Sequence, residues 1–265
     1  VLEEALTLCS PTRTPTLQAK VQHALGWLLW TMGKANESIS HLRESRAAYR
    51  VANQPKEEAM ALSALGYVIY QRGDAATAHA MYIECLTLLA ESGDDTASRM
   101  VLGKLGNLER DMGQLETSLR RFDQAVALQQ SVGDYINEMV NRIDRTRTLI
   151  ALGQLEYAET EAHEIIAASR QREVLLLEAL AQEVIATIRS KQDRHDEAIA
   201  AQRFAYDTFR GKIPLTEATL GIDLAIYLAR AGHLDELDDL TLGQEQHVES
   251  MPLVQIDYIR KLAEV

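Results

Sequence analysis

The sequence predicts an all-α protein, a right-handed α-solenoid of antiparallel helix pairs, and three observations lead to this prediction. First, residues 62–73 recur in similar form 40 residues earlier and 40 residues later, and a fixed period of this length is typical of stacked repeats. Second, aromatic residues make up only 5% of the chain while Ala and Leu are abundant, which favours helix over strand. Third, Gly and Asn, which commonly end helices, recur at the same interval of 40 residues.

Columns of aligned residues define each repeat. The aligned residues are Leu25, Leu65 and Leu105, then Gly26, Gly66 and Gly106, then Gly33, Gly73 and Gly113, and finally Asn53, Gly93 and Gly133. The Gly that follows the Leu has no side chain, so the second helix of each pair can pack close to the first. The later Gly and Asn columns suit the left-handed backbone that ends a helix. The column that begins with Gly33 continues beyond the third repeat. Gly153 follows Gly113 by 40 residues, Asp193 occupies the next position, and Gly232 lies one residue before the position after that.

The periodicity predicts a single repeat domain over residues 1–265. It begins with a partial repeat at 1–16, whose helix ends at Ser10-Pro11, and it finishes with a capping helix at 253–264. Between them we expect helix pairs at about 17–53, 56–93, 96–133, 136–170, 174–211 and 215–247. Because the chain opens in mid-helix without a Met, we expect it to be a fragment of a longer protein.

Composition narrows the possible partners. The net charge of -12 disfavours an electrostatic grip on nucleic acid or on an anionic membrane. No run of 18 apolar residues and no secretory signal is visible. Cys9 and Cys85 are interpreted as reduced thiols. These features predict a cytoplasmic protein with no direct contact with nucleic acid or membrane.

No catalytic or metal-binding motif stands out. Gly211-Lys212 lacks the other residues of a phosphate-binding loop. His163-Glu164 opens like a zinc-protease motif, but Ala167 stands where the second His is needed. We therefore expect no enzyme activity, no cofactor and no bound metal.

The columns resemble the tetratricopeptide repeat family, which alternates two antiparallel helices. The second repeat carries the pattern best, with Leu62, Leu65-Gly66, Ile69, Ala78 and Tyr82. The resemblance is strong from about residue 20 to 210. The family's usual step is 34 residues, and the longer 40-residue step here is similar to repeats of large bacterial signalling proteins and transcription regulators.

The resemblance implies a concave groove lined by the first helix of each pair. Residues just after the packing Gly, and three further on, share one face of that helix and should point into the groove. The predicted binding residues are His23, Trp27, Trp30, Tyr67, Tyr70, Asn107, Arg110 and Arg147. Aromatic and Arg side chains are common anchors of interfaces, and Arg can hold a carboxylate.

Each of these residues also has a purely structural interpretation. Trp27 and Trp30 could pack between repeats instead of lining a groove. Arg110 could pair with Asp111 or Glu109, and Arg147 with Asp144.

The functional prediction is a non-catalytic scaffold that binds a protein, a peptide or another domain of its parent chain. Its expected role is the sensor or coupling module of a bacterial signalling or transcription-regulatory protein. Two alternatives stay open. One is a small-ligand receptor that uses the aromatic residues, and the other is self-association, including a homodimer, through the end repeats.

Overall fold

The structure is a computed structural model that describes residues 15–92, 95–236 and 240. Within these residues the chain forms eleven α-helices and no β-strand. The helices fall into two compact units, Val1–Asp134 and Tyr135–Val265, which are described one at a time. The predicted capping helix, most of the predicted partial repeat and the end of the last predicted pair lie outside the described residues.

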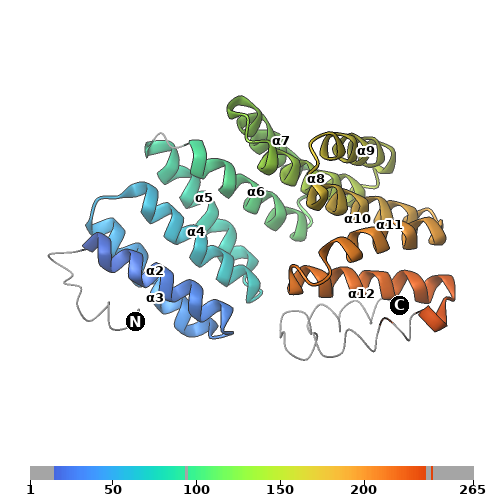
Figure 1. The fold of residues 1–265 in the computed structure, drawn as a ribbon. Helices are drawn as coiled ribbons and strands as arrows, with labels where there is room; N and C mark the ends of the chain where they lie inside the picture. The colour runs from blue at the N-terminus through green and yellow to red at the C-terminus, as the bar shows by residue number, and fades with distance from the viewer. Residues whose placement is uncertain (1–14, 93–94, 237–239, 241–265) are drawn as a thin grey trace. The chain divides into compact units, whose positions relative to one another are not determined.

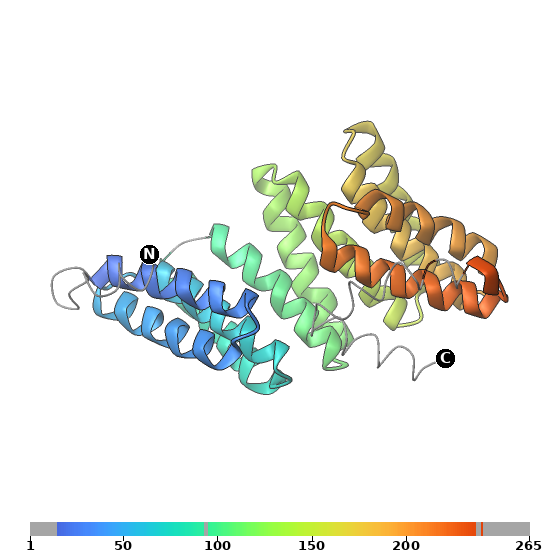
Figure 2. The ribbon, with the colours of Figure 1, turned by 60° about the horizontal axis from the view of Figure 1, so that its bottom comes forward.

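The first unit contains six helices in three pairs (Figure 1). They are α2 (Pro15–Thr31), α3 (Ala35–Val51), α4 (Pro55–Gln71), α5 (Ala75–Ser92), α6 (Asp95–Asp111) and α7 (Leu115–Val132). Each helix packs against the next one along the chain, and the first helices of the pairs, α2, α4 and α6, also contact one another in turn. Figure 2 shows α2 and α3 side by side at the blue end of this unit.

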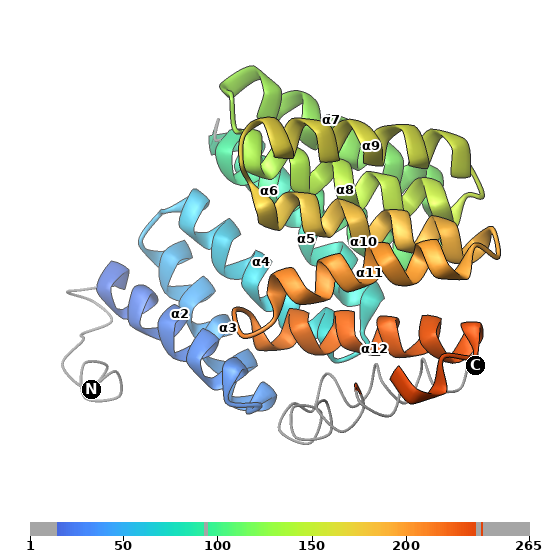
Figure 3. The same ribbon diagram turned by 45° about the vertical axis from the view of Figure 1, so that its right-hand side comes forward.

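The second unit contains five described helices (Figure 3). They are α8 (Tyr135–Ala151), α9 (Leu155–Gln171), α10 (Leu175–Lys191), α11 (His195–Phe209) and α12 (Pro214–Ala231). Successive helices again pack together, and α8 also contacts α10. Because short turns join helices that pack on their neighbours, both units are stacks of antiparallel pairs. The predicted all-α fold of antiparallel helix pairs is confirmed.

The packing glycines lie where the two helices of a pair approach most closely. A Cβ atom added to Gly26 would lie 2.6 Å from Cγ of Leu42, and one added to Gly106 would lie 2.8 Å from Cζ of Phe122. Both facing side chains are fully buried. The absence of a side chain at these positions therefore lets a large residue of the second helix fill the space, as the sequence columns predict.

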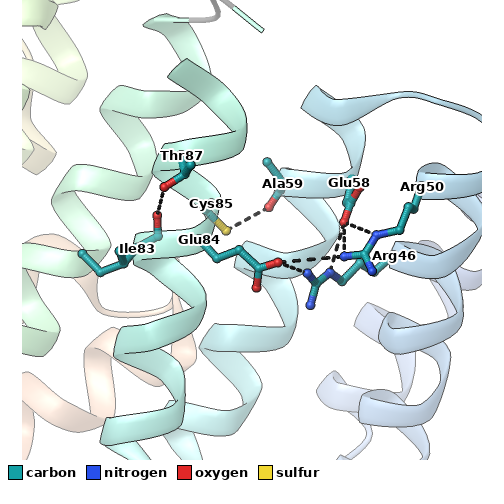
Figure 4. Close-up of polar contacts among 8 residues, drawn as sticks. All are labelled: Arg46, Arg50, Glu58, Ala59, Ile83, Glu84, Cys85 and Thr87. Carbon is teal, nitrogen blue, oxygen red and sulfur yellow. Dashed lines mark hydrogen bonds and ion pairs between the residues drawn. The ribbon is translucent and has the colours of Figure 1, made fainter. Parts of the chain in front are cut away.

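At two places in the chain, an ion pair joins the second helix of one pair to the first helix of the next pair. Arg50 at the end of α3 donates through Nη2 to Oε1 of Glu58 at 2.6 Å, and Arg170 of α9 donates through Nε to Glu178 at 2.7 Å. The two pairs stand at the same place in the 40-residue period. We call this arrangement the junction clasp. In Figure 4 the first clasp also includes Arg46, which donates to Glu58 and to Glu84 of α5.

The turns inside the pairs need a left-handed residue. Gly33, Gly113 and Gly153 have φ values of 75°, 75° and 76°. At the first of these turns the N–H of Gly33 reaches the carbonyl of Trp30, and that of Lys34 reaches the carbonyl of Leu29, which satisfies carbonyls at the end of α2. Asp193 occupies the equivalent position with φ 59°, although a side chain disfavours this conformation.

Asp193→Gly is therefore expected to raise the free energy of unfolding by about 0.5–1 kcal/mol, because relief of left-handed strain outweighs the greater freedom of Gly in the unfolded chain. Urea denaturation followed by circular dichroism measures the effect. The matched change Gly153→Asp should lower the free energy of unfolding by a similar amount. A lower midpoint for Asp193→Gly would contradict the assignment of strain to this turn.

Candidate functional site

Three predicted aromatic residues come together in the first unit. Trp27 and Trp30 of α2 both contact Tyr67 of α4, with ring centroids 5.8 Å apart for Trp27 and 6.0 Å apart for Trp30. All three rings are half-buried and pack against the core residues Ile39 and Leu42 of α3, among others. The rings therefore take part in packing while keeping part of their surface accessible. We call Trp27, Trp30 and Tyr67 the aromatic face.

The ring of His23 is held by a hydrogen bond from Trp27, a member of the aromatic face. Nε1 of Trp27 donates to Nε2 of His23 at 3.0 Å. An indole N–H can only donate, so Nε2 of His23 must carry no proton and the proton of the neutral ring sits on Nδ1. Burial, together with the nearby Lys104 ammonium, lowers the pKa of His23, which also favours the neutral ring. His23 therefore offers Nδ1–H as a hydrogen-bond donor.

Lys104 of α6 reaches the neighbouring helix from a half-buried position. Its Nζ donates to Oγ of Ser63 on α4 at 3.1 Å, and burial lowers the pKa of the Lys104 ammonium. Across residues 15–92 and 95–236, no carboxylate lies within ion-pair distance of this ammonium. Lys104 is thus a cation whose described protein partner is a neutral hydroxyl.

Sequence reasoning missed both Lys104 and Ser63, although signals for them exist. Lys104 lies one helical turn before the predicted Asn107, and Ser63 lies 40 residues after the predicted His23. Extending the face one turn toward the start of each first helix would have included them.

The other predicted residues of the first unit lie further along α4 and α6. The hydroxyl of Tyr70 donates to Oδ2 of Asp111. Nε of Arg110 lies 3.6 Å from Oδ1 of the same carboxylate, so Arg110 makes the pairing that the sequence offered as an alternative. Asn107 is half-buried on α6 between Lys104 and Arg110.

Arg147 belongs to α8 of the second unit and is held by two carboxylates. Its Nη1 lies 2.6 Å from Asp144, and its Nη2 lies 2.6 Å from Glu183 of α10. Burial acts to lower the pKa of the Arg147 guanidinium, but the charges of Glu183 and Asp144 outweigh it and raise that pKa. The pairing with Asp144 is the alternative considered from the sequence.

A hollow of about 290 Å³ opens beside His23. It is lined by Lys20, His23, Ala24, Tyr49, Glu57 and Met60. Its volume is at the lower limit of the usual range for small-molecule pockets.

Two features of the described residues bear on catalysis, namely the possible groups of metal ligands and the buried thiol of Cys85. Among the described residues, no group of three or more His, Cys, Asp or Glu could hold a metal ion. The Cys85 thiol donates to the carbonyl of Ala59 at 3.2 Å (Figure 4). Burial raises the pKa of this thiol to about 12, so it is a poor nucleophile. None of the helices that could be searched is long and apolar enough to cross a membrane.

Comparison with known proteins identifies the class of repeat. Residues 57–131 match the model of the tetratricopeptide repeat family. The match covers most of the stretch from α4 to α7, and together with the fold it confirms the resemblance to this family that the sequence predicts. No curated protein matches the sequence.

Solved structures share this fold at low sequence identity. Aspartyl phosphate phosphatase F from Bacillus subtilis is 15% identical over 89% of this chain and 61% of its own, with a TM-score of 0.70. NprR in complex with its cognate peptide NprX is 12% identical over 94% and 72%, with a TM-score of 0.73. A signal transduction ATPase with a tetratricopeptide repeat sensor, from Pyrococcus horikoshii, is 14% identical over 98% and 40%, with a TM-score of 0.69. The chain thus spans less than two thirds of the phosphatase and of the ATPase.

Proposed function

We propose that the first unit binds a peptide, or an extended segment of a protein, on its aromatic face. The observation that carries this proposal is the contact of three half-buried rings from two helices. Rings already held in place lose little conformational freedom when a ligand binds, and Trp and Tyr are frequent anchors of interfaces. The chain itself needs no catalytic group for this role.

Two neighbours support a sensing role. One of the similar structures holds its cognate peptide, and another uses tetratricopeptide repeats as the sensor of a larger signalling ATPase. We infer that this chain likewise acts in the cytoplasm as the sensor or coupling module of a larger signalling or transcription-regulatory protein. The ligand would then be a peptide, a partner protein or another domain of the parent.

Selection from a display library of random heptapeptides tests the proposal. Peptides that are recovered should change the emission of Trp27 and Trp30, which are the only two Trp in the chain. Tyr67→Ala removes the ring that touches both Trp, and affinity should fall at least ten-fold, corresponding to about 1.4 kcal/mol or more.

Tyr157→Ala provides the matched control, because Tyr157 is 72% exposed on α9 of the second unit. This variant should bind the selected peptides as the parent does. Circular dichroism checks that both variants are folded. Equal affinity of the parent and Tyr67→Ala would rule out the aromatic face as the binding site.

A further inference from the structure

Two pairs of polar side chains stand at the same place in the repeat with acid and base exchanged, and we propose that they decide which second helix stacks on which first helix. The first joins His79 of α5 to Glu109 of α6, and the second joins Glu159 of α9 to Arg189 of α10. The second pair follows the first by 80 residues, which is two periods. We call them the reversed pairs. The inference goes beyond the proposed function.

In the first unit the buried member of the reversed pair is a carboxylate. The Glu109 side chain is 1% exposed. A carboxylate accepts hydrogen bonds, and Oε1 of Glu109 accepts from Nε2 of His79 at 3.2 Å and from Nε of Arg121 on α7 at 3.3 Å. Its other oxygen, Oε2, is buried and has no hydrogen-bond partner among the described residues. Both donors to this carboxylate therefore belong to second helices that flank α6.

In the second unit the buried member is a cation. The Arg189 side chain is 10% exposed, and its Nη2 donates to Oε1 of Glu159 at 2.5 Å. Its Nε lies 3.4 Å from Oε2 of Glu197 on α11. Both carboxylates again belong to second helices, so the first helix here carries the base and the second helices carry the acids. This is the reverse of the arrangement around Glu109.

The fold does not need charges at this place. Ile39 of α3 stands one period before His79, and Ile69 of α4 stands one period before Glu109. Both Ile side chains belong to one apolar cluster of the first unit. Replacement of a buried ion pair by well-packed apolar residues is often neutral or stabilising. Since an apolar pair can hold such a junction together, we infer that the reversed pairs serve the choice of partner.

The need for such a choice follows from the repeats themselves. Helices of similar shape and sequence can stack on the wrong neighbour, and misassembly and swapping are common failures of repeat proteins. Stacking of α9 on α6 would bring Glu159 to Glu109, two carboxylates. Stacking of α3 on α6 would place Ile39 there and remove a donor. Either error leaves a buried charge poorly compensated, which is costly, so the reversed pairs favour the native partners.

A copy of the apolar junction tests the proposal. The double variant His79→Ile with Glu109→Ile gives the α5–α6 junction the residues that stand at Ile39 and Ile69. Its urea midpoint should equal or exceed that of the parent. After rapid dilution from urea, the fraction of chains recovered as oligomers, with helices of one chain stacked on another, should rise at least two-fold. The excess should grow with protein concentration. Size-exclusion chromatography with light scattering measures this fraction.

Ile39→Leu with Ile69→Leu is the matched control, because both places stay apolar, and it should refold as the parent does. Glu159→Ile with Arg189→Ile repeats the test in the second unit and should also raise the oligomer fraction. If that fraction stays at the parent's value in either charged-to-apolar variant, the proposal is wrong for that pair. Failure to fold, or a lower urea midpoint than the parent's, would also overturn it, because the pair would then serve stability.

Discussion

Phe122→Ala is expected to lower the free energy of unfolding of the first unit by about 3–5 kcal/mol. The Phe122 side chain is fully buried, and its ring occupies the space that Gly106 leaves between α6 and α7. Truncation removes apolar contacts and leaves a cavity that two rigid helices cannot close. Urea denaturation followed by Trp emission measures the loss, because both Trp belong to this unit.

The control for this change is Phe204→Ala. Phe204 also lies on a second helix, α11, but it is 36% exposed and belongs to the second unit. Its truncation should leave the transition seen by Trp emission unchanged and should cost less than about 1 kcal/mol in the helical signal. If Phe122→Ala shifted the Trp transition no more than Phe204→Ala does, close packing on Gly106 would not be a source of stability.

Glu58→Gln is expected to lower the free energy of unfolding by about 2 kcal/mol. The Glu58 side chain is 6% exposed and accepts from Arg50 and Arg46. Removal of one partner of a buried pair costs about 3–5 kcal/mol because it leaves an uncompensated charge. The expected loss is smaller here, because the Arg50 side chain is 60% exposed and water can solvate it.

Glu37→Gln is the matched substitution for this test. Glu37 lies in the first turn of the same helix that carries Arg50, and it pairs with Lys34 where both side chains are exposed. An exposed pair contributes about 0–1 kcal/mol, so this change should cost at most that amount. Equal losses for the two substitutions would mean that burial of Glu58 adds nothing to the clasp.

The helices and turns were predictable because their signals are local. The packing Gly, the turn Gly and the spacing of apolar residues each act within one repeat. Because the repeats follow one another every 40 residues, each of these signals occurs several times along the chain. Asp193 shows the limit of this reasoning. Its place in the period predicted a turn, but only the structure shows that the residue adopts the left-handed conformation, with φ 59°.

The candidate site was predictable in part. The sequence placed Trp27, Trp30 and Tyr67 on one surface for two reasons. Trp30 lies about one helical turn after Trp27, and Tyr67 follows Trp27 by one 40-residue period. The bond from Lys104 to Ser63 joins residues 41 apart, and the pair of Arg147 with Glu183 joins residues 36 apart. Such contacts depend on how far long side chains extend across a helix boundary. Spacing along one helix carries no information about them.

The junction clasp has a consequence for how the protein unfolds. Arg50 with Glu58, and Arg170 with Glu178, each bond residues of successive repeats, so opening one repeat also breaks a contact that its neighbour needs. In a linear array, such nearest-neighbour terms decide whether repeats melt one by one or as a cooperative block. The clasps therefore extend cooperativity across the turns they span, and fraying that starts at a terminal repeat is opposed at each of these junctions.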